Sequence, residues 1–474
     1  MSIHHLLSVP WGSDRPGQLY SAPGSLIMKM RLGEGPVNLP RFADVQAGIS
    51  RPAVALDGGP IDRLLSHFSD RHNVTMLHRS ASQRPARRNT DGGYDLVEHM
   101  TGLARTYRVD VDRETAVADL VNHLRNVATV EHASHNYLAT VPLEAEIAAF
   151  SPGSDAWSSR LQIEAPEAMA YEPGDPAVVI AIVDTGAALG HPELVHRLRR
   201  GLDLVTLVGA DLASGVRLLQ EPEGGDPQDN VGHGTGCAVI VGGLGSAIPP
   251  GLAGLCGLLP IRVLAGAILP GKPQPVGIGA LSDIDRGVKD AIDLGAVVVS
   301  MSFGTPEDAL DPHDPVPHQD VVRYGLARGC VMVAAAGNSG TAAAYAPASL
   351  DGVIAVGAAQ PDGSPAPFST SGPQVALLAP GVRIVTASLG GYSMVSGTSF
   401  AAPFVSAAAG LLLSFARGRA YALDASAAKR ILQDSATPLP RGAPAGHGAG
   451  VLNAHAALQQ LDREIDQSIS KERN

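Results

Sequence analysis

Short apolar runs alternate with helix-like segments from residue 178 to the end of this 474-residue chain. Apolar runs of this length are typical of strands buried on both faces. Since parallel strands need a crossover, and a helix usually supplies it, the alternation predicts a parallel sheet covered by helices on both faces. The expected strands are Val178–Val183, Leu258–Leu264, Val297–Met301, Val331–Ala335 and Val353–Ala358. The expected helices are Gly236–Leu244, Ser282–Leu294, Asp320–Ala327, Phe400–Leu413, Ala427–Leu432 and Ala454–Leu461, with a frayed end from Asp462 to Asn474.

The preceding region predicts a second, smaller unit. Its order is strand, helix, strand, strand, helix, strand, which is the ferredoxin-like α+β arrangement. We expect a tail at 1–24, this domain at 25–140, a linker at 141–156 and the main α/β domain at 157–474. The segments are Leu26–Leu32, Ile61–Phe68, Val74–Leu77, Tyr107–Val111, Val117–Leu124 and Val130–Leu138.

Three polar residues stand at the edges of predicted buried elements. Asp184 ends the first apolar run, His233 lies between glycines before another, and Ser399 opens the long apolar helix. A serine nucleophile needs a base within reach, and a carboxylate that orients the base. A serine at a helix start is by itself usually a cap. The three residue types together favour nucleophilic catalysis.

The motifs around these residues resemble those of the subtilisin family (subtilases), in its order Asp, His, Ser. They are Asp184-Thr185-Gly186, His233-Gly234-Thr235 and Gly397-Thr398-Ser399-Phe400-Ala401-Ala402-Pro403. The resemblance implies a subtilisin-like fold and a serine endopeptidase that needs no cofactor for its chemistry. Ser399 would be the nucleophile, His233 the general base and acid, and Asp184 the orienting carboxylate.

The resemblance extends to the groups that would hold a substrate. Asn338, at the end of the run Ala334 to Gly337, matches the oxyanion-hole asparagine of the family. The matching substrate-binding residues are Ser302, Phe303, Gly304, Ala336 and Gly337. The family usually has Asn and Leu where this chain has Ser300 and Phe303, so specificity stays open, with an apolar residue before the scissile bond as the default. Residues Tyr345 to Ser349 are expected to close the pocket.

The small N-terminal unit is similar to the inhibitory propeptide of many subtilases, which implies a zymogen. Its last strand would then lie in the substrate cleft, with an autoprocessing cut between Tyr137 and Leu138. A cut further along, between Leu143 and Ser154, stays open.

Structural calcium is a further possibility that the resemblance raises. Glu193 matches an acidic ligand of relatives, but the loop from Gly243 to Gly251 has no Asn or Asp. Calcium takes six to eight oxygen ligands, so this support is weak.

Charge and composition limit the partners. The net charge is −11, and the acidic surplus falls after residue 150, which argues against nucleic acid. No apolar, charge-free stretch of about 18 residues is apparent, so we expect no membrane partner. No secretory signal is visible, which predicts cytoplasmic synthesis, with signal-independent export left open. The three cysteines have no Cys-x-x-Cys spacing, which speaks against disulfides and zinc.

The expected partners are a protein or peptide substrate and the chain's own propeptide. Two alternatives to a general endopeptidase remain. One is a dedicated maturation peptidase for one partner protein or peptide. The other is a propeptide-locked binding module without turnover.

Overall fold

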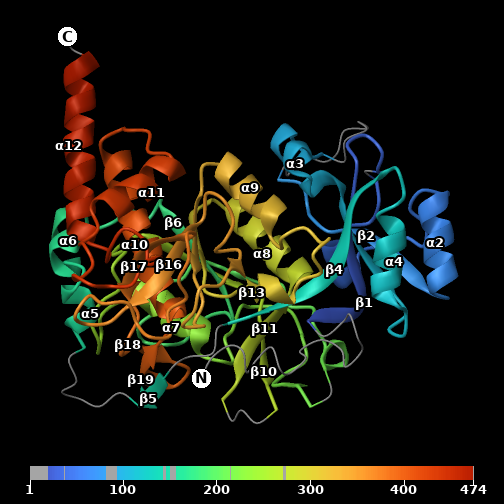
Figure 1. Ribbon diagram of the computed structural model, residues 1–474, viewed down its shortest axis with the longest axis horizontal. Coiled ribbons are helices and arrows are strands. Elements are labelled where there is room, and N and C mark those ends of the chain that lie inside the picture. The colour runs from blue at the N-terminus through green and yellow to red at the C-terminus, as the bar shows by residue number, and fades with distance from the viewer. Residues whose placement is uncertain are drawn as a thin grey trace.

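The computed structural model describes residues 20–36, 38–81, 93–141, 146–149, 156–213, 215–270 and 274–472. In Figure 1 the blue and cyan N-terminal elements gather at one end of the molecule, and the green to red elements at the other. We call residues 20–141 the N-terminal part and residues 156–472 the main part.

The main part is built on a seven-stranded sheet with the order β17-β16-β14-β12-β6-β9-β7. All neighbouring strands in it are parallel, as predicted. The expected strands lie within one or two residues of their predicted bounds, while β17 and β7 were not predicted. The strands are β6 (Val179–Asp184), β7 (Leu202–Asp203), β9 (Gly257–Arg262), β12 (Ala296–Met301), β14 (Val331–Ala335), β16 (Ile354–Ala359) and β17 (Val375–Pro380).

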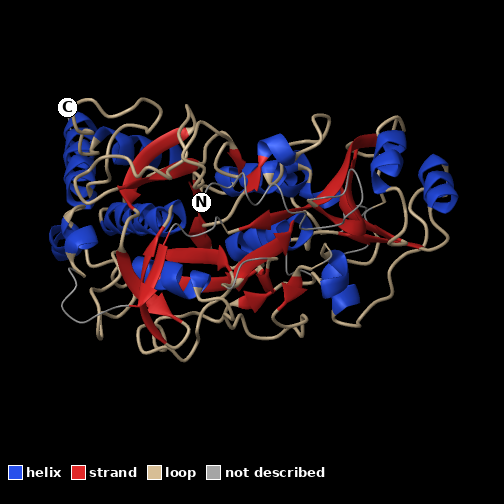
Figure 2. Cartoon of the chain, turned by 60° about the horizontal axis from the view of Figure 1, so that its bottom comes forward, coloured by secondary structure: helices blue, strands red, loops and turns tan. Residues whose placement is uncertain are grey.

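Helices cover both faces of this sheet (Figure 2). Along β6, Ile180 and Ile182 join the apolar cluster of α7 (His233–Gly242) and α10 (Thr398–Gly418). Ala181 and its odd-numbered neighbours join the opposite cluster, with α8 (Leu281–Asp293) and α9 (Gln319–Ala327). Side chains on a strand alternate between faces, so burial on both explains the continuous apolar run.

Helix α10 is the central helix of the main part. It begins two residues before its predicted start, which puts Ser399 in its first turn. By length and composition α10 is apolar enough to cross a membrane, although no such stretch was expected from the sequence. However, 94% of its apolar window is buried inside the protein. Its apolar surface is therefore used in packing against the sheet.

The N-terminal part forms an antiparallel sheet with the order β2-β3-β1-β4 and its own apolar cluster. The predicted element order is present, with two short helices added. β1 begins at Ser21, four residues before residue 25, where the predicted tail was expected to give way to this domain. The elements are β1 (Ser21–Met30), α1 (Phe42–Gln46), α2 (Pro60–Phe68), β2 (His72–Met76), α3 (Leu96–Thr101), β3 (Thr106–Val111), α4 (Val117–Leu124) and β4 (Val130–Thr140).

Strand β4 joins the two parts through main-chain hydrogen bonds. It pairs with β1 on one side and continues into the main part, where Leu138 to Thr140 pair antiparallel with β11. The N-terminal sheet therefore extends as β4-β11-β10-β8. The added strands are β8 (Arg217–Leu218), β10 (Ala265–Ile268) and β11 (Val276–Ala280).

The predicted linker also contains a strand. β5 (Glu146–Ala149) pairs antiparallel with β19 (Gly391–Ser396), which pairs in turn with β18 (Ile384–Ser388). The chain thus pairs with the main part through β4 before residues 142–145 and through β5 after them.

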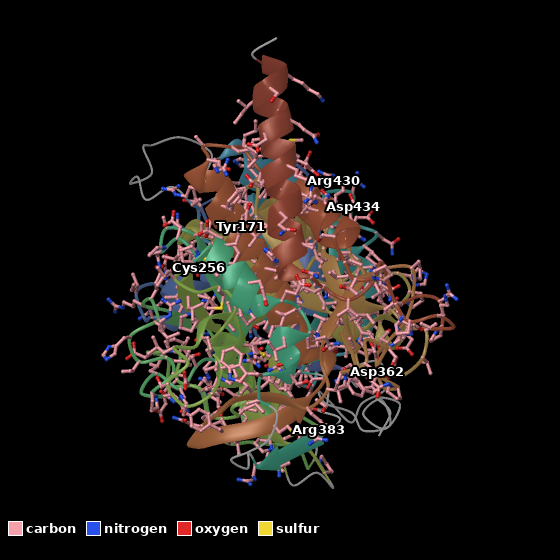
Figure 3. All side chains as sticks on the ribbon, turned by 90° about the vertical axis from the view of Figure 1, so that its left-hand side faces the viewer. Tyr171, Cys256, Asp362, Arg383, Arg430 and Asp434 are labelled. Atoms are coloured by element: carbon pink, nitrogen blue, oxygen red, sulfur yellow. The ribbon has the colours of Figure 1, made fainter. Side chains whose placement is uncertain are left out.

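The C-terminal helix α12 (Ala454–Glu472) is longer than predicted, and the expectation of a frayed end from Asp462 was wrong. Arg430 of α11 (Ala425–Asp434) binds Glu464 of α12 at 2.6 Å. Figure 3 shows α12 projecting above the main part, with Arg430 and Asp434 along its flank. The remaining elements are α5 (Ser158–Leu161), α6 (Ala165–Tyr171), β13 (Thr305–Pro306), β15 (Tyr345–Ala346) and the 3-10 turns Leu103–Arg105, Gly209–Asp211 and Glu307–Ala309.

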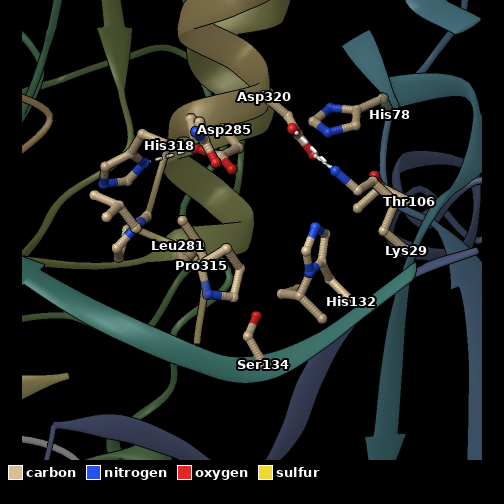
Figure 4. Close-up of a pocket in the computed structure, with 14 residues that line it drawn as sticks. Lys29, His78, Thr106, His132, Ser134, Leu281, Asp285, Pro315, His318 and Asp320 are labelled. Atoms are coloured by element: carbon tan, nitrogen blue, oxygen red, sulfur yellow. Dashed lines mark hydrogen bonds and ion pairs between the residues drawn. The ribbon is translucent and has the colours of Figure 1, made fainter. Parts of the chain in front are cut away.

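Ion pairs connect the N-terminal part to α8 and α9. Lys289 of α8 is fully buried and binds Glu98 at 2.8 Å, and Lys29 binds Asp320 at 2.9 Å. Between the two parts lies a cavity of about 60 Å³ lined by both, and Figure 4 shows Lys29 and His132 facing Asp320 and Asp285 across it. Contacts of this polar kind are typical of interfaces that can separate.

The Lys289–Glu98 pair generates a stability prediction. Lys289→Met leaves the fully buried Glu98 carboxylate without its counter-ion, so the free energy of unfolding should fall by about 3 kcal/mol. Adding Glu98→Gln should restore part of it, because one of the two carboxylates that Lys289 binds is then neutral, whereas Asp293, 2.6 Å from Lys289, still lacks its partner. The control is Arg430→Met, in an exposed pair, which should cost under about 1 kcal/mol. Urea unfolding measures all three, and equal losses from Lys289→Met and Arg430→Met would contradict the prediction.

Candidate active site

Asp184 lies at the carboxyl end of β6, an interior strand of the main sheet. Its side chain is buried, and Oδ1 accepts a hydrogen bond from the Thr185 backbone N–H at 2.7 Å. Carboxyl ends of parallel strands are where α/β folds gather functional groups.

His233 is the first residue of α7, and its imidazole lies beside Asp184. Nδ1 is 2.8 Å from Asp184 Oδ1, so Nδ1 donates and Nε2 is left as the acceptor nitrogen. Nε2 is buried and has no hydrogen-bond partner among the described residues. The ring is therefore oriented by one nitrogen and has the other available as a base.

The carboxylate of Asp229 fixes the turn that leads into His233. Oδ1 accepts from the backbone N–H groups of Val231 and Gly232, and Oδ2 accepts from the N–H and hydroxyl of Thr235. The sequence reading assigned Asp229 no role, although an Asp shortly before a glycine-rich helix start is a recognisable capping signal.

Ser399 is the second residue of α10 and lies near His233. Cys237, one turn after His233, donates to the Ser399 carbonyl, with Sγ···O at 3.4 Å. Ser399 Oγ donates to the Ser302 carbonyl at 3.3 Å, and Ser302 Oγ donates to the Ser399 carbonyl at 2.8 Å. The first turn of a helix has unpaired N–H groups and a positive dipole end, which favour a developing negative charge.

Asn338 is held next to this turn by Thr398. Its Oδ1 accepts from the Thr398 N–H at 2.9 Å and from the Thr398 hydroxyl at 2.8 Å. Thr398 Oγ1 also accepts from the Gly337 N–H at 3.2 Å. Because the amide oxygen is fixed in this way, Nδ2 is the donor end of the side chain. Sequence reasoning missed this role of Thr398, which only the long-range contact reveals.

The neighbours of His233 shift its proton affinity. Burial lowers the pKa, but the charge of Asp184 and its hydrogen bond outweigh burial and hold the pKa of His233 well above 6.5. Burial raises the pKa of the Cys237 thiol, so the thiol stays protonated. Asp184, His233 and Cys237 bring ligand atoms within 4.8 Å of one another, the one such group among the described residues.

Glu193 does not have the surroundings of a calcium ligand. Its carboxylate accepts from the backbone N–H groups of Gly245, Ser246 and Ala247 at 2.7, 3.0 and 2.9 Å. These N–H groups occupy the Glu193 oxygens that would otherwise bind a cation, and an N–H group cannot itself be a calcium ligand. The group that the sequence suggested therefore does not fit calcium here.

Backbone of the N-terminal part lies along the predicted substrate-binding segment. Thr140 and Gly304 exchange two hydrogen bonds, with N···O distances of 3.2 and 3.0 Å. On the other side, the Val141 N–H donates to the Gly277 carbonyl at 3.1 Å. Substrate-like strand pairing thus occurs at Thr140 and Val141.

The register does not fit a cut between Tyr137 and Leu138. Pairing at Gly304 is antiparallel, so β4 runs toward Ser302 and Ser399 as its residue numbers rise, and Thr140 has only reached the level of Gly304. Tyr137 instead donates to Asp314 at 2.6 Å, and Leu138 is buried in the pairing with β11. These contacts of Tyr137 and Leu138 favour a cut further along the chain than the predicted one, because sheet pairing sets the register.

A cavity of about 490 Å³ opens on the other side of His233. Its walls include Tyr392 and Phe400, and β5 pairs with the same strand, β19, that carries Tyr392. This cavity and the paired strands β5 and β19 therefore lie on the same side of His233.

Comparisons with known proteins agree with this geometry. A family model described as the subtilase family matches residues 175–454. The chain is similar to thermitase of Thermoactinomyces vulgaris, at 32% identity over 65% of this chain and 100% of that protein. It is also similar to a thermophilic serine proteinase of Bacillus sp. (strain AK1), at 34% identity over 64% of this chain and 67% of that one. Among solved structures it resembles the prenylagaramide maturation protease PagA, with a TM-score of 0.51 and 28% identity over 63% of this chain and 98% of that chain.

The raised pKa of His233 predicts how the reactivity of Ser399 depends on pH. Only neutral His233 can take the serine proton, so the rate of labelling by a fluorophosphonate should fall as pH drops through a half-point above 6.5. Asp184→Asn should slow labelling by about 10⁴-fold, because the imidazole loses its orienting carboxylate. Ser399→Ala gives the background rate. A half-point below 6.5 in the unmodified protein would contradict the assigned electrostatics.

Proposed function

This chain belongs to the subtilase family and is a serine endopeptidase, and on that premise we propose that Ser399, His233 and Asp184 form its catalytic triad. The observation that carries the proposal is the buried imidazole of His233. Its Nδ1 is engaged by Asp184, and its Nε2 has no competing partner among the described groups.

The chemistry follows from these positions. Ser399 Oγ turns from the Ser302 carbonyl to His233, transfers its proton to Nε2 and attacks the substrate carbonyl. The imidazolium, stabilised by Asp184, then protonates the leaving amine as the peptide C–N bond breaks. A water molecule then gives a proton to His233 and attacks the acyl-enzyme carbonyl. The ester bond to Ser399 breaks, Ser399 regains its proton and the carboxylic acid product leaves. Side-chain and backbone groups supply all of these steps.

Two donors are proposed for the oxyanion. They are the side-chain amide of Asn338 and the Ser399 backbone N–H at the start of α10. Thr398 fixes the amide before the reaction, so little reorganisation is needed when charge develops.

We further propose that the N-terminal part is an inhibitory propeptide and that the chain is a zymogen. A substrate would add as a strand against Gly304 and β11. Thr140 and Val141 already use these main-chain groups, so substrate and the N-terminal part compete for them. The ion pairs with α8 and α9 hold the occupying strand in place.

A dedicated maturation peptidase is the second candidate. The similar protein PagA is described as a maturation protease, and here extended chain pairs with the main part on both sides of the site. Long main-chain contact suits a single extended recognition segment. Cleavage of a peptide library separates the candidates, since a dedicated enzyme cuts one motif and a general one cuts many.

Labelling with a fluorophosphonate tests the triad and its donors. The self-processed protein should be labelled at Ser399, and Ser399→Ala should abolish both labelling and turnover while the protein stays folded. Asn338→Ala should keep the nucleophile but lower kcat by roughly 100- to 1,000-fold. An unlabelled wild-type protein would instead favour the non-catalytic binding module, and an unchanged kcat in Asn338→Ala would place the second donor elsewhere.

The register of β4 predicts where processing occurs. N-terminal sequencing of the purified protein should find a start after Val141, because Thr140 and Val141 are paired with Gly304 and Gly277 rather than with the Ser302 carbonyl beside Ser399. Ser399→Ala should remain uncut and serves as the control. A new N-terminus at Leu138 would mean that the strand shifts before cleavage, contrary to the proposal.

A further inference from the structure

The slot that would receive a substrate side chain runs between two backbone segments. One passes through Gly304, shortly after Ser302, which binds the Ser399 carbonyl. The other passes through Gly337, just before Asn338. Both segments begin beside Ser399 and both match the substrate-binding segments of the family, so the side chain preceding the scissile bond is expected to enter between them.

Tyr345 occupies the inner end of this slot. Its strand, β15, pairs with β13 directly after Gly304. A Cβ added to Gly337 would lie 2.7 Å from two ring carbons of Tyr345, and one added to Gly304 would lie 3.3 Å from its Cβ. The ring is therefore in contact with both walls, and the space between them is taken by the protein's own aromatic side chain.

The ring is also held firmly. Tyr345 is 6% exposed and belongs to the apolar cluster beneath the sheet. Burial, aided by the charge of Asp308, raises the pKa of its phenol to about 12, and a hydrogen bond with Ser339 acts against this. The hydroxyl is thus neutral near pH 7. If the ring moved out of this position, Tyr345 would lose its apolar contacts and its hydrogen bond with Ser339.

We propose that Tyr345 is the floor of the pocket next to the scissile bond and restricts this peptidase to small residues there, such as Gly, Ala or Ser. The proposal rests on the proposed function, since it presumes that Ser399 is the nucleophile. It narrows the default expectation of an apolar residue there to a small one. Even one methylene group that a pocket cannot accommodate is worth roughly 10- to 200-fold in discrimination, and a benzyl group exceeds that size by far.

Peptidyl diphenyl phosphonates with an Ala or a Phe side chain at the reactive position test this inference. The self-processed wild type should react at least about 100-fold faster with the Ala probe. Tyr345→Gly removes the floor, so the ratio of its Phe-probe rate to its Ala-probe rate should rise by tenfold or more over that of the wild type. Tyr345→Phe keeps the ring and should retain the preference for Ala.

A fluorophosphonate without a peptide is run in parallel on every variant. A variant labelled at the wild-type rate is folded and has an active Ser399. The ratio of its rates with the Ala and Phe phosphonates then reports the pocket alone. Equal rates with the Ala and Phe probes in the wild type, or an unchanged ratio in Tyr345→Gly, would overturn the inference while leaving the triad intact. Absence of fluorophosphonate labelling in the wild type would overturn the triad, and the pocket assignment with it.

Discussion

The active-site geometry depends on how closely two backbones approach beside Asp184. A Cβ on Gly234 would lie 2.2 Å from the Gly186 carbonyl, and a Cβ on Gly186 would lie 2.4 Å from the Pro227 carbonyl. Only glycine lets α7 begin against the end of β6, which brings the His233 ring to the carboxylate. The arrangement of the proposed triad therefore depends on Gly186 and Gly234 as well as on the triad residues themselves.

That close contact also determines what the N-terminal part can do. With His233 and Ser399 fixed at the edge of the sheet, extended chain has a path between Gly304 and β11, and β4 takes it. On the proposed function, inhibition and substrate binding use the same main-chain hydrogen bonds. Interface ion pairs such as Lys29 with Asp320 add affinity that a short peptide lacks, which explains how one strand can remain bound.

The sequence predicted what local pattern and residue type determine. Apolar runs located the buried strands, and glycine-flanked motifs located Asp184, His233 and Ser399, which the fold brings together. It did not predict what distant contacts determine. Three features can be seen only in the tertiary structure. They are the hydrogen bonds from Thr398 to Asn338, the register of β4, and the extension of α12, which the Arg430–Glu464 ion pair supports.

A shallow pocket changes where specificity has to come from. If Tyr345 leaves room only for small side chains, the pocket contributes little apolar burial to substrate affinity. The remaining affinity must come from main-chain pairing along Gly304 and β11 and from the surface beside β19. Such an enzyme recognises an extended segment of several residues rather than a single side chain, and few folded proteins expose one. Unfolded loops and short precursor peptides are the substrates that meet this requirement.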